Sequence, residues 1–477
     1  MRPSKIQLSN SIVTELISIR RDSRATVNQD VLEIIDGHVA TKVPLRDPGV
    51  KAALTKLTFG PVNEDELFAI AMNAGGDNAA LALPSILQRL DIGGWLNYSI
   101  VDEKIQVICS LEPRGHALET QRRRVSPLSV LAVSEHAIIR QLNNVITAES
   151  PLTGWDLQIH SIQLTSMLLS LDGSREVSEI ASAFEIPKDS VIKVLNLATR
   201  SGLVRFADEP IDAALNLWSL PDLWFHSMSR VGHHRNGYGG TYWQEGKVNP
   251  EPATRPLCAD PSAYIPFTPF DVNTIGGSDL PFGEVVRQRT STRIHDDECP
   301  ITSTQLGELL GRVGVVRSTV HDGHQELSFR QVPSGGALHE LEIYPLVHNC
   351  EGLAPGLYHY DAGGHRLGLI RPADPQTRLL LEDTQRTSTM ENPPQISLFL
   401  AARFGRAMWK YESMAYALIL KHVGVMYESL YLTTTAMGLA GCALGGGNSQ
   451  AFAAASGLPM FVEGGVGEFT VGSRPKL

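Results

Sequence analysis

The chain has 477 residues, about three times the ~150 residues of a typical domain, which predicts two to four domains with sizeable cores. Lys and Arg total 41 against 51 Asp and Glu, a formal net charge of -10. This acidic excess disfavours non-specific binding to the phosphate backbone of nucleic acids. Nucleic acid is therefore not expected as a partner. Hydrophobic residues make up 43% and charged residues 19%, which excludes wholesale disorder.

Cysteine usage and apolar segments indicate where the protein works. Five cysteines lie far apart, with no CxxC pair, which favours a reducing cytoplasm over a disulfide framework or a zinc site. The N-terminus lacks the apolar core of a secretory signal, so no export is expected. The 34 residues from Ser429 to Val462 contain no Asp, Glu, Lys or Arg, but their runs of Thr and Gly predict a buried helix and a turn instead of a membrane span.

The first 220 residues predict two related units with the order helix, helix, turn and strand. The turn of the first unit lies at Gly94 and that of the second at Gly202, 108 residues further on. The helices before the two turns match at the same offset. This spacing predicts a duplicated winged-helix module, with units at residues 1–125 and 126–220.

A winged helix suggests DNA binding, but the charges disfavour it. Residues 151–206 carry five Lys or Arg and six Asp or Glu, so this unit is not basic. The favoured interpretation is a peptide clamp, in which an extended segment adds a strand to the wing and packs against the third helix. A purely structural domain is the alternative.

Residues 221–280 are rich in Gly and Pro and predict an ordered connector that wraps on a neighbouring domain. Three histidines in it, His226, His233 and His234, invite a metal hypothesis. Adjacent histidines project in different directions, and no Cys or carboxylate stands at ligand spacing, so no metal site is expected.

Residues 281–477 predict an α+β domain that carries the chemistry. The expected helices lie at 283–289, 302–313, 376–389 and 411–439, and the expected strands at 340–347 and 356–361.

Three segments of this domain suggest a ligand site. Residues 287–293 place arginines and a serine close together, which suits a phosphate, although a solvated basic surface explains them as well. The small-residue turns at 333–338 and 438–448 would let backbone donors approach a planar ligand, although either alone is an ordinary tight turn.

In this order, the three segments resemble the FMN-dependent nitroreductase superfamily. Residues 409–418, 426–432 and 443–449 narrow the resemblance to the thiazole/oxazole-forming peptide dehydrogenases, and they are most similar to the cyanobactin azoline oxidases. Residues 128–152 and 225–232 also fit this pattern, so the resemblance covers roughly residues 126–477.

The resemblance implies a nitroreductase-like FMN domain, with an antiparallel-rich sheet flanked by helices, preceded by two winged-helix peptide-clamp units. In relatives the FMN phosphate and pyrimidine are held by an Arg-x-Ser-x-basic motif, and a Pro-Ser-Gly-Gly turn reaches the ring from the other subunit of a homodimer. A further turn faces flavin N5 and O4, and a C-terminal basic residue lies near the phosphate. The matching residues here are Arg289, Ser291 and Arg293; Pro333, Ser334, Gly335 and Gly336; Leu444, Gly445 and Gly446; and Arg474. Thr290 and Glu428 depart from the pattern of many relatives.

Lys410 and Tyr411 match the essential Lys-Tyr pair of the family. Aromatising an azoline removes a proton from one ring carbon and a hydride from the next, and the hydride passes to the flavin. Either a Lys amine or a Tyr oxygen beside an ammonium can serve as the base. The sequence leaves open which of the two takes the proton.

The resemblance thus implies a homodimeric, FMN-dependent azoline oxidase that converts thiazoline or oxazoline rings of a ribosomally made peptide to thiazole or oxazole, with dioxygen reoxidising the flavin. It would act after a cyclodehydratase, a possible partner, and the N-terminal units would hold the leader of the precursor peptide. One alternative is a general nitroreductase-type enzyme that uses NAD(P)H on small molecules. The other is a peptide-binding scaffold with a vestigial flavin site.

Overall fold

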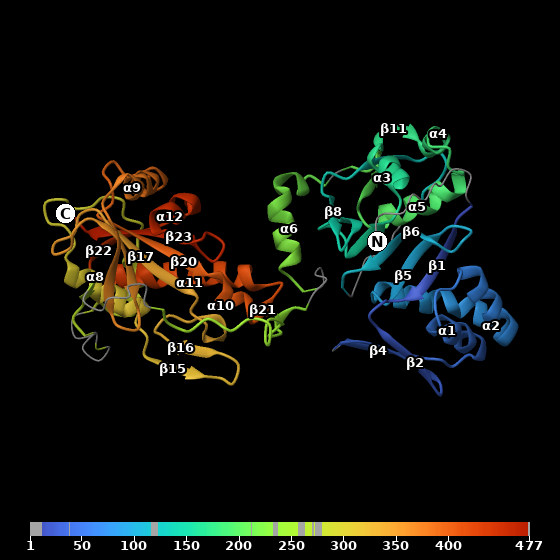
Figure 1. Ribbon diagram of the computed structural model, residues 1–477, viewed down its shortest axis with the longest axis horizontal. Helices are drawn as coiled ribbons and strands as arrows, with labels where there is room; N and C mark the ends of the chain where they lie inside the picture. Colours follow the sequence, from blue (N-terminus) through green and yellow to red (C-terminus); the bar gives the residue numbers. More distant parts are fainter. Residues whose placement is uncertain are drawn as a thin grey trace. The chain divides into compact units, whose positions relative to one another are not determined.

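The computed structural model describes residues 12–37, 39–115, 123–210, 212–231, 237–255, 263–269, 271 and 279–475. The chain forms two compact units, unit 1 at Met1–Asn236 and unit 2 at Gly237–Leu477 (Figure 1). Across the described residues, no helix has the length and apolar character needed to cross a membrane. The division into four parts, with boundaries at 125, 220 and 280, stays a prediction.

Unit 1 is built on a six-stranded antiparallel sheet to which both predicted N-terminal units contribute. The strands, in spatial order, are β1 (Thr14–Ile19), β5 (Leu96–Val101), β6 (Val107–Pro113), β10 (Trp155–Ile159), β9 (Val145–Glu149) and β8 (Ile138–Leu142). β6 pairs with β10, with Leu111 opposite Leu157. Because this ladder crosses the boundary expected at residue 125, the two N-terminal parts share one sheet.

The first part of unit 1 adds a small sheet and a helical pair. The sheet contains β2 (Arg24–Asn28), β3 (Val31–Asp36) and β4 (Val39–Pro44), and the helices are α1 (Pro48–Thr58) and α2 (Glu64–Ile92). Gly76 interrupts α2 with a backbone outside the helical region, at φ 68° and ψ -159°. Gly94 then turns the chain into β5 with φ 69°. The helical segments expected at 64–70 and 83–90 both lie in α2, one on each side of Gly76, and the turn and strand follow as predicted. Helix α1 was not predicted.

The second part repeats this order with a three-stranded sheet. Its elements are β7 (Val130–Val133), α3 (Ile162–Leu169), β11 (Asp172–Glu176), α4 (Val177–Ala183), α5 (Lys188–Arg200) and β12 (Val204–Phe206). The apolar face of α5 is buried, and Gly202 turns the chain into β12 with φ 73°. Helix α6 (Leu220–Met228) follows. The winged-helix assignment of both parts stays a prediction.

Unit 2 is an α+β unit around a seven-stranded antiparallel sheet. The strands, in spatial order, are β14 (Tyr264–Pro266), β19 (Arg366–Pro372), β18 (Gly356–Asp361), β17 (Leu341–Val347), β20 (Ile396–Arg403), β23 (Glu463–Ser473) and β22 (Leu439–Leu444). Every residue of β17 and β20 is buried, as expected for central strands that are covered on both faces.

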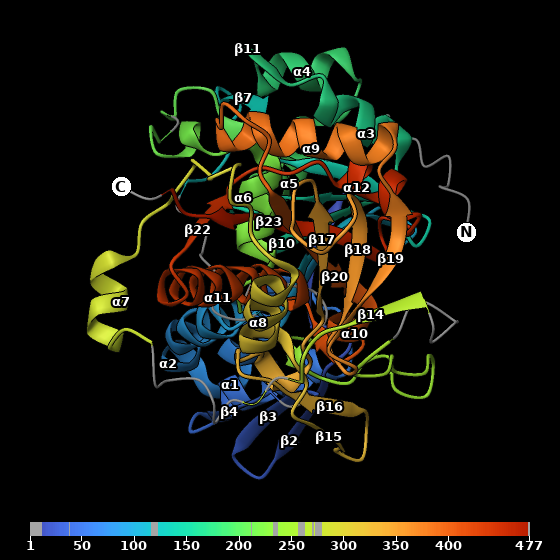
Figure 2. The same ribbon diagram turned by 90° about the vertical axis from the view of Figure 1, so that its left-hand side faces the viewer.

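Helices cover the two faces of this sheet (Figure 2). α8 (Ser303–Gly314) and α11 (Ala415–Ala436) pack on one face, and α9 (Pro375–Ser388) and α12 (Ser449–Ser456) on the other. Each face of the sheet forms a hydrophobic core with its two helices, and successive strand residues point into opposite cores. Ile343 packs in the core with α8 and α11, and Tyr344 packs in the core with α9 and α12. The remaining elements include α7 (Phe282–Gln288), β15 (Ser318–His321), β16 (Glu326–Phe329), the short 3-10 turn η4 (Gly335–Ala337) and α10 (Phe404–Met408).

The helix predicted over residues 411–439 is wrong at its start. Tyr411–Glu412 form strand β21, which pairs with β13 (Gly239–Gly240) of the connector, and α11 begins only at Ala415. Between them, Ser413 has a φ of 62°, which is incompatible with a continuing helix. The connector thus supplies strands β13 and β14 to unit 2.

Candidate active site

The segment after α7 lies against strand β22 and helix α11. The Thr292 N–H donates to the Gly441 carbonyl at 3.0 Å. The Ser291 Oγ and Tyr431 Oη atoms share a hydrogen bond of 2.8 Å, and the Arg289 guanidinium lies 5.2 Å from the centre of the Tyr431 ring. Tyr431 therefore anchors the predicted phosphate motif to α11.

This segment carries unbalanced positive charge. The Arg474 Nη2 atom donates to Thr292 Oγ1 at 3.3 Å, which brings the predicted C-terminal basic residue to the motif. Within the part of the chain that the structure describes, Arg289, Arg293 and Arg474 form no ion pair, whereas Arg287 pairs with Glu284 on α7. Forked guanidinium donors without carboxylate partners suit a phosphate group.

The turn at Leu444–Gly446 begins at the last residue of strand β22. The Tyr427 Oη atom donates to the Leu444 carbonyl at 3.1 Å, and the Ala443 N–H donates to Tyr431 Oη at 2.9 Å. Gly445 and Gly446 are exposed, and a Cβ added at Gly445 would meet nothing within 4 Å. The backbone of this turn is therefore open to a ligand, and Tyr431 connects it to the predicted phosphate motif.

The predicted Pro333–Gly336 turn lies at a different part of α11. The Gly335 N–H donates to His422 Nε2 at 2.7 Å. The Ser334 Oγ atom accepts from the His339 N–H at 3.0 Å, and Gly336 has a φ of 66°. This positive φ explains the glycine at 336, because a side chain there would be strained.

Lys410 and Tyr411 converge on this turn. A Cβ added at Gly336 would lie 2.7 Å from Tyr411 Oη and 3.2 Å from Lys410 Nζ. Both side chains are half-buried. The Lys410 Nζ atom lies 5.1 Å from the Tyr242 ring centre and 5.6 Å from that of Tyr411. The structure therefore brings the predicted catalytic pair onto the predicted flavin turn.

Helix α11 organises two groups of predicted residues. Tyr431 bonds to Ser291 and to the Ala443 N–H, so it joins the segment of Arg289 and Ser291 to the Leu444 turn. His422 accepts from the Gly335 N–H, and the neighbouring Gly336 lies against Lys410 and Tyr411. The two anchors are nine residues apart, which is about 13 Å along a helix. On one chain the predicted site residues thus form two groups.

Four side chains of these groups were not predicted. Tyr242 lies in the connector, and its N–H donates to the Lys410 carbonyl at 3.1 Å. Glu340 pairs with His422, and Tyr431 joins two predicted segments. Tyr431 could have been predicted from its spacing, because Tyr427 stands four residues before it on the same helix face. Nothing in the sequence pointed to Tyr242.

Glu468 is a buried carboxyl beside the Leu444–Gly446 turn. It is 6% exposed, its carboxyl accepts a hydrogen bond from the Asn448 N–H, and a Cβ added at Gly447 would lie 2.9 Å from its Oε1 atom. Burial raises the pKa of Glu468 to about 7, and the nearby Asp383 charge adds to this effect. The carboxyl therefore titrates near neutral pH next to a predicted flavin turn.

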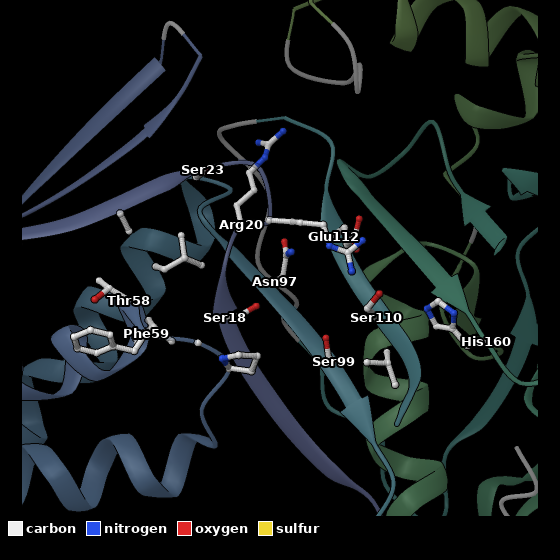
Figure 3. Close-up of a pocket in the computed structure, with 17 residues that line it drawn as sticks. Ser18, Arg20, Ser23, Thr58, Phe59, Asn97, Ser99, Ser110, Glu112 and His160 are labelled. Carbon is white, nitrogen blue, oxygen red and sulfur yellow. The ribbon is translucent and has the colours of Figure 1, made fainter. Parts of the chain in front are cut away.

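Unit 1 contains an open pocket of about 460 Å³ that is lined by both polar and apolar residues. Figure 3 shows its floor, where Ser18, Asn97, Ser99 and Ser110 project from β1, β5 and β6, with Phe59 on one side and His160 on the other. Asn97 is 6% exposed, and its Oδ1 atom has no hydrogen-bond partner among the described residues. Such a floor suits a ligand that offers hydrogen-bond donors.

Of the three histidines considered as metal ligands, only His226 lies among the described residues. His226 lies on α6, with its ring centre 5.3 Å from that of Trp218 and tilted by 43°, and His233 and His234 lie outside the described residues. In the described ranges, no three His, Cys, Asp or Glu side chains are grouped as a metal site.

Comparison with known families identifies the fold of unit 2. Residues 286–473 match the nitroreductase family. Unit 2 contains a nitroreductase-family domain. Residues 131–235 match the cyanobactin oxidase ThcOx, so the resemblance expected from the sequence is confirmed over both segments.

Individual relatives cover parts of the chain. The trifolitoxin-processing protein TfxB of Rhizobium leguminosarum bv. trifolii is 31% identical over 113 residues, 23% of this chain and 30% of that protein. The nitroreductase-like protein MJ1384 of Methanocaldococcus jannaschii is 28% identical over 163 residues, 34% of this chain and 77% of that protein. Among solved structures, a chain of the E. coli microcin synthetase McbBCD complex with truncated pro-MccB17 is 17% identical, with a TM-score of 0.34, and the match covers 56% of this chain and 99% of that chain. The chain thus spans less than a third of TfxB.

FMN is the cofactor of the nitroreductase family, and the donors of this domain fit it. Arg289, Arg293 and Arg474 offer positive charge without carboxylate partners in the described segments, which suits the phosphate. The exposed backbone at Gly445, with open space above it, suits the edge of a planar ring.

Proposed function

We propose that this protein is an FMN-dependent oxidase that converts thiazoline or oxazoline rings of a ribosomally made peptide to thiazole or oxazole. The convergence of Lys410 and Tyr411 on the Gly336 turn carries this proposal, because it joins a base to a surface that suits a flavin. The matches to the nitroreductase family and to ThcOx support it.

The proposed chemistry divides between the cofactor and the chain. Bound FMN supplies the acceptor for the hydride that leaves the azoline ring. The rings of Tyr242 and Tyr411 attract a cationic Lys410, since its Nζ atom lies 5.1 and 5.6 Å from their centres. We therefore assign the proton transfer to the Tyr411 oxygen, with Lys410 as the cation that stabilises its negative charge.

We also propose that the working site is shared between two copies of the chain. On one chain the Tyr431 and His422 groups are separated by about 13 Å along α11. In a homodimer, the first group of one protomer would hold the FMN phosphate, and the second group of its partner would present Lys410, Tyr411 and the Gly336 turn to the ring. Each of the two sites in the dimer would then contain one complete set of the predicted residues, drawn from both protomers.

The peptide would be held outside the oxidase domain. We propose that the winged-helix parts at residues 1–125 and 126–220 bind its leader, and that a cyclodehydratase, which forms the rings, supplies the substrate. Leader binding to the full chain, measured by fluorescence anisotropy, tests this part. An absence of binding would remove the clamp proposal and leave the oxidase proposal standing.

The main test is to incubate the FMN-loaded protein with an azoline-containing peptide in air and to follow the peptide mass and the flavin spectrum. We expect loss of one H2 per ring with transient bleaching of the flavin, and dioxygen reduced as FMN is reoxidised. Bound FMN that oxidises NAD(P)H but leaves the peptide unchanged would contradict the proposal in favour of a general nitroreductase.

A further inference from the structure

The turn that carries Gly335 and Gly336 has a strained backbone. Gly336, Ala337 and His339 all have positive φ, at 66°, 54° and 47°. Residues with a Cβ rarely adopt this region, and they stay there only where the surrounding structure holds them. The contacts that hold this turn therefore decide its position.

A buried histidine and glutamate provide one of these contacts. The Gly335 N–H donates to His422 Nε2 at 2.7 Å, and His422 Nδ1 lies 2.6 Å from Glu340 Oε1. A backbone N–H can only donate, so Nε2 must carry a lone pair, and the proton of the imidazole lies on Nδ1. His422 Nδ1 thus donates to Glu340, which is fully buried, and this bond fixes the tautomer that holds the turn.

We propose that His422, oriented by Glu340, is a positioning residue of the oxidase that fixes the Gly335–Gly336 turn against Lys410 and Tyr411. This inference rests on the proposed function. The turn has little freedom, because a Cβ at Gly336 would lie 2.7 Å from Tyr411 Oη, and one at Gly335 would lie 3.1 Å from His422 Nε2. A shift of the turn would therefore displace the surface that the pair shares with FMN. Because the Gly335 N–H already donates to His422, it is not available as a donor to FMN.

The same domain contains a matched control. His359 Nε2 lies 3.1 Å from Glu342 Oε2, and His359 is 1% exposed. This pair also joins a buried imidazole to a buried carboxyl, two residues after Glu340, and Glu342 in addition pairs with Arg403 at 3.4 Å. It makes no hydrogen bond to the Gly335–Gly336 turn in the described structure. Substitution of His359 thus reports the general cost of removing a buried histidine.

The test compares His422→Leu, His422→Gln and Glu340→Gln with His359→Leu in the full chain. FMN affinity, the visible spectrum of bound FMN, thermal stability, and kcat and KM for an azoline peptide are measured for each. His422→Leu removes the acceptor for Gly335, so we expect FMN binding about tenfold weaker, an altered flavin spectrum and kcat lowered more than KM is raised. His422→Gln keeps an acceptor oxygen near Nε2, and Glu340→Gln keeps one for Nδ1–H, so both should recover most of the affinity and spectrum.

The control and the outcomes separate this inference from the proposed function. His359→Leu should lose stability as His422→Leu does but keep the wild-type FMN affinity and spectrum. If His422→Leu behaves like His359→Leu in these two readouts, or if His422→Gln is as impaired as His422→Leu, the positioning role is wrong. A wild-type protein that binds FMN but leaves azolines unchanged would instead contradict the proposed function.

Discussion

The Ser291 and Tyr431 hydroxyl groups, 140 residues apart in the chain, share a hydrogen bond of 2.8 Å. The same Tyr431 oxygen accepts from the Ala443 N–H at 2.9 Å, one residue before the Leu444–Gly446 turn. A single phenol therefore sets the distance between the predicted phosphate motif and the predicted ring-facing turn. Its removal should affect cofactor binding more than folding.

Tyr431→Phe should weaken FMN binding by up to about 30-fold, because it removes two hydrogen bonds that are each worth about 1 kcal/mol, or about 2 kcal/mol together. The FMN dissociation constant, measured by fluorescence quenching, checks this. Tyr358→Phe is the control, since the Tyr358 Oη atom donates to the Ala354 carbonyl at 2.8 Å in the same unit but away from this segment. Equal FMN affinities of the two variants would contradict the anchoring role of Tyr431.

Arg289→Gln and Arg293→Gln should each lower FMN affinity about 10- to 100-fold, because a charge-assisted hydrogen bond to phosphate is worth about 1.5–3 kcal/mol. Riboflavin, which lacks the phosphate, should bind these variants and the wild type alike. Arg287→Gln removes a neighbouring arginine whose charge Glu284 already balances, and it should leave FMN affinity unchanged. Loss of riboflavin affinity in the arginine variants would show that the phosphate is not their target.

Tyr411→Phe should lower kcat for azoline oxidation by about 100- to 10,000-fold, the usual contribution of a general base. Lys410→Ala should lower it to a similar extent, whereas Lys410→Arg keeps the cation and should retain more activity than Lys410→Ala. Single-turnover bleaching of bound FMN measures the chemical step directly. Activity of Tyr411→Phe close to that of the wild type would transfer the role of the base to Lys410.

Mixed dimers test whether two protomers share one site. Co-expressed Arg289→Gln and Lys410→Ala chains should form heterodimers in which one site has both wild-type residues, so activity should exceed that of either variant alone. A mixture of Lys410→Ala with Tyr411→Phe is the control, because both changes fall in the same group and no site recovers. Peptide oxidation by purified heterodimers, with different tags on the two chains, is the measurement. An active control mixture would argue against the shared site.

Glu468→Gln should flatten the dependence of stability on pH. Since the pKa of Glu468 rises from 4.5 in the unfolded chain to about 7 in the fold, the protonated form stabilises the protein below about pH 4.5, and this contribution is lost as pH rises through 7. Gln keeps an acceptor for the Asn448 N–H without ionising. The free energy of unfolding of the variant, relative to that of the wild type, should therefore be higher at pH 8 than at pH 4.5 by on the order of 3 kcal/mol. Chemical denaturation at several pH values checks this, and parallel curves would contradict it.

The sequence predicted the elements that are defined by local signals. The helix expected at 302–313 is observed as α8, whose N-terminus carries the capping box of Thr302 and Gln305. The strand expected at 356–361 is β18, with the same bounds. These elements depend on neighbouring residues, so a single stretch of sequence contains what decides them.

Elements and contacts that depend on distant residues were missed. Strand β21 exists because Tyr411 pairs with Gly240, and no local pattern reveals a partner so far away in the chain. For the same reason Tyr242, whose ring lies near Lys410, could not be predicted. The motifs predicted candidate site residues, which stay a prediction, but not that one chain divides them into two groups along α11.

The pairing of β13 with β21 limits how this enzyme can be divided or recombined with its relatives. A C-terminal fragment that begins at residue 281 would leave Tyr411 without its strand partner and Lys410 without the Tyr242 ring. Exchange of the nitroreductase-like portion between homologues therefore has to begin at or before Gly237, where unit 2 starts. The connector thus belongs to the same structural unit as the predicted catalytic pair.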